Sequence, residues 1–120
     1  MLDLGVERIG DLGIVECEGR IVRSESAFKL RRAVNSLDDC KTIVMDLSEV
    51  SAVEGGGLGM LVFLQQWAND HQIELKLFNP RKSVFDRLQI AGPMRSFDII
   101  SLPEMMQLLS EADQHFASAA

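Results

Sequence analysis

The sequence is poor in cysteine, histidine and basic residues, and each shortage argues against a class of protein. Its 120 residues include two cysteines, Cys17 and Cys40, with no CxxC spacing and no histidine nearby. This pattern predicts buried free thiols rather than a disulfide framework or a zinc site, and we expect no metal. Lysine and arginine number 12 against 18 acidic residues, which gives a net charge of −6. A nucleic-acid surface needs the opposite balance, so we expect no nucleic-acid partner.

Long apolar runs are missing as well. The longest nearly uncharged apolar stretch, residues 55–64, is ten residues long, whereas a membrane-spanning helix needs about 20. Residues 1–10 lack the basic start and the apolar run of a signal peptide. We therefore expect a cytoplasmic protein with no direct membrane insertion.

Residue patterns typical of an enzyme are also absent from the sequence. Its histidines, His71 and His115, lie at the polar end of a predicted helix and in a predicted frayed tail, so both are expected on the surface. The chain contains no G-x-S-x-G elbow, no H-E-x-x-H helix and no paired-carboxylate motif. We therefore predict no enzymatic activity, no catalytic residue and no cofactor.

Hydrophobic periodicity predicts strands that alternate with helices within one domain. The predicted strands are residues 6–9, 13–22, 42–47, 73–78 and 99–100. The segment 42–47 is almost continuously apolar, which is typical of a strand buried on both faces of a mainly parallel sheet. Its predicted neighbour is 73–78, reached through a crossover helix. This alternation of elements indicates an α/β fold.

Helices are predicted between these strands. Ser24 is expected to cap the first helix, and one face of that helix carries Ala27, Leu30, Val34 and Leu37. The second helix is predicted at about 58–70. Pro80 is expected to begin the third helix and Gly92 to end it. The last helix is predicted from Pro103 to about Ala112, followed by a frayed tail at 113–120.

A glycine-rich segment, residues 54–59, lies between a buried strand and a helix, where sites collect in α/β sheets. Glycines at a helix start can hold a phosphate, which makes a nucleotide site one alternative. No Gly-Lys-Ser/Thr tripeptide is present, however, and Met60 and Val62 occupy the third-glycine positions of the dinucleotide pattern. The charge of Glu54 would also repel phosphate. A further alternative is a tight turn with no binding role.

The residues around this segment resemble the signature of the STAS domain family, which includes the bacterial anti-sigma factor antagonists. Residues 43–48 read Ile-Val-Met-Asp-Leu-Ser and residues 53–59 read Val-Glu-Gly-Gly-Gly-Leu-Gly. In the family, a buried strand ending Asp-Leu-Ser leads to Asp-Ser-Ser-Gly-Leu-Gly. Weaker landmarks agree at Gly10, Asp11, Gly19, Arg20, Ile21, Val84, Leu88 and Gly92. The resemblance covers about 6–109 and implies one domain with a core of about 6–110. It implies a central mixed sheet of four to five strands with helices mainly on one side.

The resemblance also implies a role in bacterial transcription regulation and signal transduction through protein–protein interaction. In the sigma-regulatory members, the partner is an anti-sigma factor that is also a serine kinase. An alternative role is that of a STAS subunit or scaffold in a larger assembly, such as a lipid-transport ABC system or a stress-signalling complex. A homodimer is also compatible with the sequence.

The usual phosphorylation switch of the family is missing. The family's aspartate falls on Glu54, its phosphoserine on Gly55 and its second serine on Gly56. A glycine cannot accept a phosphate, so no modification is expected at Gly55. Ser48 and Ser51 are the reserve phosphoacceptors, and Ser51 is preferred because it is predicted to lie in a loop. The glycines also remove side-chain capping from the helix start.

The predicted partner-binding residues are Glu54, Gly55, Gly56, Gly57, Leu58 and Val62. At about 100° per residue, Leu58 and Val62 fall on the polar side of the second helix. The core side carries Met60, Leu61, Leu64, Trp67 and Ala68. Two apolar side chains one turn apart and next to the glycines could anchor a partner protein. The alternative is that loops or the terminal helix cover them.

Overall fold

The computed structural model describes residues 2–21, 24–89 and 97–119, with the side chains of Ser24 and of 114–119 left out. The elements in chain order are β1 (Leu2–Ile9), β2 (Leu12–Ile21), α1 (Ser24–Asn35), β3 (Thr42–Val53), α2 (Gly56–Asp70), β4 (Glu74–Phe78), α3 (Lys82–Gln89), β5 (Asp98–Ile100) and α4 (Leu102–Ala119). None of the helices in these ranges is long and apolar enough to cross a lipid bilayer.

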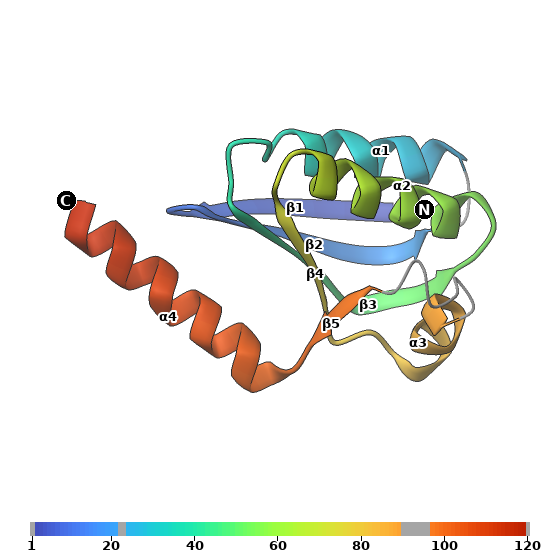
Figure 1. The fold of residues 1–120 in the computed structure, drawn as a ribbon. Helices are drawn as coiled ribbons and strands as arrows, with labels where there is room; N and C mark the ends of the chain where they lie inside the picture. Colours follow the sequence, from blue (N-terminus) through green and yellow to red (C-terminus); the bar gives the residue numbers. More distant parts are fainter. Residues whose placement is uncertain (1, 22–23, 90–96, 120) are drawn as a thin grey trace.

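The described strands form one five-stranded mixed sheet in the order β1-β2-β3-β4-β5. Strands β1 and β2 form an antiparallel hairpin, whereas the pairs β2–β3, β3–β4 and β4–β5 are parallel. Strand β3 is therefore central, and α2 is the crossover that brings β4 to its side (Figure 1). Both features confirm the prediction made from the uniformly apolar 42–47 segment, because such a strand is stable only with both faces covered.

Helices α1 and α2 lie side by side on one face of the sheet (Figure 1) and bury the main core with it. The predicted inner face of α1 is confirmed for Ala27, Leu30 and Val34, which are all buried. Leu37 is buried as well, but it lies in the turn after the helix end at Asn35. Helix α3 adds Val84 and Leu88 to the same core. The fold therefore has the predicted arrangement, with helices mainly on one side.

Helix α4 lies against the opposite face of the sheet (Figure 1). Its Met105 and Ala112 pack on Ile14, Val44 and Ile100 in a second, smaller core. This packing covers the part of the face where β2 and β3 begin. The part near their ends carries exposed polar residues instead.

Four predicted element boundaries were wrong. Strand β1 begins at Leu2 instead of Val6. Strand β3 continues to Val53, so the segment expected to be a loop is a strand in which Ser51 is exposed between buried Val50 and Val53. Helix α3 begins at Lys82 instead of Pro80. Helix α4 continues to Ala119, so the predicted tail at 113–120 is helical as far as it is described. The predicted strand end at Val22 and helix end at Gly92 lie outside the described residues.

Candidate functional site

The predicted site lies where β3 passes into α2, next to the end of β2. The Glu54 amide donates a hydrogen bond to the Ile21 carbonyl at 3.3 Å, which ties the segment to β2. The Gly57 amide donates to the Glu54 carbonyl, and the Gly59 amide donates to the Gly55 carbonyl. Gly55 has a φ of +53°, in the left-handed region that favours glycine. The sequence from β3 to α2 therefore makes a tight turn at the carboxyl edge of the sheet.

The glycines of this turn have different roles. An ideal Cβ placed on Gly57 would lie 1.6 Å from the Ile21 carbonyl oxygen, so no side chain fits where α2 meets the β2 backbone. At Gly55, Gly56 and Gly59, no described atom beyond the adjoining residues and the backbone of the same helix lies within 4 Å of such a Cβ. Gly57 is thus needed for packing, and the other three expose bare backbone to the surroundings.

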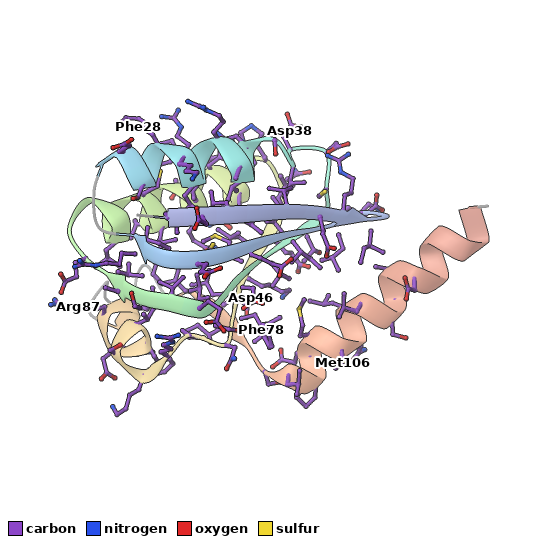
Figure 2. The ribbon with its side chains drawn as sticks, turned by 180° about the vertical axis from the view of Figure 1, so that it is seen from behind. Phe28, Asp38, Asp46, Phe78, Arg87 and Met106 are labelled. Carbon is purple, nitrogen blue, oxygen red and sulfur yellow. The ribbon has the colours of Figure 1, made fainter. Side chains whose placement is uncertain are left out.

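Helix α2 has no side-chain hydrogen bond capping its first turn among the described residues. This agrees with the loss of capping predicted from the glycines. Glu54 does not serve as a cap, because its Oε1 accepts a hydrogen bond from Arg87 Nη2 of α3 at 2.9 Å. Figure 2 shows Arg87 at the edge of the molecule on the α3 side. Both side chains are half exposed, so the pair contributes at most about 1 kcal/mol. It links the entry of α2 to α3.

The two apolar residues predicted to anchor a partner are half-buried. Leu58 packs against the main core, whereas Val62 is half-buried and is not part of that core cluster. The most exposed apolar residue of α2 is Phe63, at 43%, which the sequence reasoning did not single out. Its ring lies under Arg31 of α1, with 4.8 Å from the guanidinium carbon to the ring centroid. The sequence does contain an indication of this exposure. Gly56, Gly59 and Phe63 are spaced i, i+3 and i+7, which places Phe63 on the same helix face as the two glycines.

Both reserve serines lie in β3, so the prediction of a loop at Ser51 was wrong. Ser51 is exposed and its hydroxyl donates to the Gly19 carbonyl at 3.3 Å. The register passes from Gly19↔Val50 to Arg20↔Ala52, so Ser51 is the extra residue of a β-bulge. Ser48 is half-buried, and its hydroxyl contacts both the Asp46 carboxylate and the Asn79 amide. Of the two, Ser51 has the more accessible hydroxyl.

Comparison with known protein families matches residues 3–104 to the STAS domain. Comparison with solved structures finds the anti-sigma factor antagonist SpoIIAA in its unphosphorylated form, with 13% identity, a TM-score of 0.72, and coverage of 91% of this chain and 97% of that chain. An anti-sigma factor antagonist from Mycobacterium paratuberculosis matches with 17% identity, a TM-score of 0.74, and coverage of 90% and 93%. The murine anion transporter Slc26a9 matches with 18% identity and a TM-score of 0.61, over 95% of this chain but 19% of the transporter. At these identities the similarity shows a shared fold. No curated protein sequence matches the chain.

Proposed function

Because the chain belongs to the STAS domain family, we propose that it is a non-enzymatic module that binds an anti-sigma factor or a serine-kinase-like protein through the start of α2. The observation that carries this proposal is the bare backbone at Gly55, Gly56 and Gly59, where an added Cβ would meet no described atom from another part of the chain within 4 Å. A partner can approach this backbone more closely than it could approach a surface of side chains. The structural neighbours include two anti-sigma factor antagonists, which supports the same kind of role.

Val62 and Leu58 supply the apolar part of the proposed contact. Both are half-buried on the flank of α2 that follows the glycines. Contact energy in protein interfaces is concentrated in a few residues that become fully desolvated. Val62 is the better anchor of the two, since Leu58 already packs against the core.

The proposed interaction is not switched by phosphorylation at the usual position, because that position is Gly55. A phosphate adds about −1.5 to −2 charges and disrupts an interface when it lies beside acidic groups. Ser51 is the reserve site, since its hydroxyl is exposed at the β-bulge.

A STAS subunit of a larger assembly is the second candidate function. The observation that favours it is the match to Slc26a9, in which a STAS-like fold makes up a minor part of a transporter. Both candidates predict a protein partner, and they differ in its kind.

Purification of the tagged chain at native abundance, followed by identification of the bound protein, tests the proposal. Recovery of an anti-sigma factor or serine-kinase-like protein at a fixed ratio is the expected result. A transporter or scaffold component in its place would favour the second candidate. A calorimetric titration with ATP and GTP is expected to give no heat of binding, and a saturable heat would revive the nucleotide alternative.

A further inference from the structure

The two faces of the molecule present different charged side chains. Helix α1 presents Arg31 and Arg32 on the side away from the sheet. The sheet face on the other side, beyond α4, presents a group of carboxylates around a surface hollow of about 310 Å³. Figure 2 shows Phe28 on α1 and Asp46 beyond the strands, on opposite sides of the sheet. The net charge of −6 is therefore unevenly distributed.

The carboxylates of this acidic face are brought together by strand register. Asp3 of β1 pairs with Glu18 of β2, and Glu18 pairs with Glu49 of β3. Glu16 of β2 pairs in the same way with Asp46 of β3. Like charges directly opposite on neighbouring strands repel each other. The fold therefore keeps an electrostatic repulsion that a cationic group outside the domain would relieve.

Little within the domain neutralises the acidic face. In the described part of the chain, Glu49 has one ion pair, with Arg81 at 3.5 Å, and both of those side chains are at least half exposed. Arg20 lies two residues beyond Glu18 on β2, at the end of the face. No group of three or more potential ligands in the described residues is arranged to hold a metal ion. An extended surface with several cationic side chains fits these spread carboxylates better than a single ion does.

The face of α1 offers such a surface. Phe28 is 57% exposed, and Arg31 and Arg32 follow it at i+3 and i+4 on the same side of the helix. Arg31 lies over the exposed ring of Phe63. In the described part of the chain, no salt bridge joins either guanidinium to a carboxylate. Aromatic residues and arginine are the types enriched in protein interfaces.

We propose that the α1 face of one copy, defined by Phe28, Arg31, Arg32 and Phe63, docks on the acidic face of a second copy. The two guanidinium groups then lie against the row of carboxylates, and a phenyl ring fills part of the hollow. The two faces lie on opposite sides of the sheet, so the contact is head-to-tail and each added copy exposes the same faces again. Salt at physiological concentration screens the repulsion between the net negative charges beyond about 8 Å, so this repulsion does not prevent the contact. The repulsion that remains at shorter distances keeps the association weak and the chains of copies short.

The test uses sedimentation equilibrium of the purified chain up to about 1 mM, where a contact with a millimolar Kd is populated. The mass is expected to rise continuously above the monomer value of 13.3 kDa as concentration increases. The double variant Arg31→Glu/Arg32→Glu loses both arginines of the α1 face. The variant Glu16→Gln/Glu18→Gln loses the two carboxylates on β2, at the centre of the acidic face. Each variant alone is expected to be monomeric. Mixed together, they are expected to form a 1:1 dimer that does not grow, because each supplies the face that the other lacks.

A charge-matched variant separates this contact from a change in net charge. Lys41→Glu/Lys82→Glu changes the net charge by the same amount as the arginine variant, and both lysines are highly exposed and lie outside the two faces. It is expected to associate as the native chain does. The glutamine variant relieves cross-strand repulsion, so its melting temperature is not expected to fall. A native mass that stays at the monomer value, a mixture that does not dimerise, or an equal loss in the lysine variant would each overturn the proposal.

Discussion

Gly57 and Gly59 lie two residues apart in the first turns of α2, and substitution by alanine is expected to have opposite effects on stability at the two positions. Gly57→Ala is expected to lower the free energy of unfolding by about 3 kcal/mol or more, since its Cβ would overlap the Ile21 carbonyl. Gly59→Ala has open space around it and removes a helix-interior glycine, so it is expected to stabilise by about 0.5–1 kcal/mol. Urea unfolding of both variants measures the difference. Two variants of equal stability would contradict the close approach of α2 to β2.

Cys17 is buried, and its burial, followed by the nearby charge of Asp46, raises the pKa of its thiol to about 12. At pH 8 the native protein is therefore expected to leave this thiol unmodified by a disulfide reagent, whereas the unfolded chain reacts at once. In the unfolded chain this thiol ionises near pH 9, whereas in the native chain it keeps its proton until about pH 12. Its contribution to the free energy of unfolding is therefore fully present below pH 9 and is lost as the pH rises through about 12. Urea unfolding between pH 8 and pH 11 should show a shallower loss in Cys17→Ala than in the native chain.

The segment from Glu54 to Gly59 carries no side chain that a serine kinase could phosphorylate. After incubation with the serine kinase that binds the chain and with ATP, mass spectrometry is expected to find residues 54–59 unmodified, because no hydroxyl is present there. Stoichiometric phosphate on Ser51, absent from Ser51→Ala, would show that the switch has moved to the β-bulge. If neither Ser48 nor Ser51 carries phosphate, phosphorylation of these serines does not regulate the interaction.

At the scale of elements, helix α4 begins with a capping box. The Ser101 hydroxyl accepts from the Glu104 amide at 3.4 Å, and the Glu104 carboxylate accepts from the Ser101 amide at 3.2 Å. Ser101→Ala is expected to lower the free energy of unfolding by about 1 kcal/mol. Ser110→Ala, at an exposed position in the same helix, is the matched control and is expected to change it little. Equal effects in urea unfolding would show that the box does not hold the helix start.

The sequence predicted the elements whose apolar pattern is regular. The inner face of α1 follows from its helical period and the central position of the 42–47 strand follows from its continuous apolar run, and both are confirmed. The extension of β3 to Val53 was missed because its outward residues are polar and bulged, although Val50 and Val53 keep the buried pattern. The start of α4 was also readable from the Ser-Leu-Pro-Glu sequence at 101–104.

The candidate site was predictable in position but not in detail. The motif located the turn at Gly55, whereas the contact of Gly57 with Ile21 depends on how closely α2 approaches β2. The partial burial of Leu58 and the exposure of Phe63 depend on the same packing, because each lies at a margin of the helix face. Local periodicity specifies a face, and only the neighbouring elements decide where that face ends.

At the scale of the whole molecule, the fold separates the acidic face from two adjoining surfaces, the α1 face and the start of α2, which meet at Phe63. The start of α2 lies at the carboxyl edge of the sheet. The α1 face lies on one side of the sheet, and the acidic face lies on the other side. Figure 1 shows α1 and α2 together on one side, with α4 on the other. A partner at the start of α2 and a second copy on the acidic face therefore use different parts of the surface.

The most direct test of partner binding at the start of α2 is the affinity of Val62→Glu for the protein that co-purifies with the chain. An unpaired charge in a desolvated contact is expected to weaken binding by at least about tenfold, or about 1.4 kcal/mol, with little change in melting temperature. Asn69→Glu adds the same charge two turns further along the exposed side of α2 and is expected to leave the affinity unchanged. Equal affinities for the native chain and both variants, or binding lost only because Val62→Glu unfolds, would contradict the account.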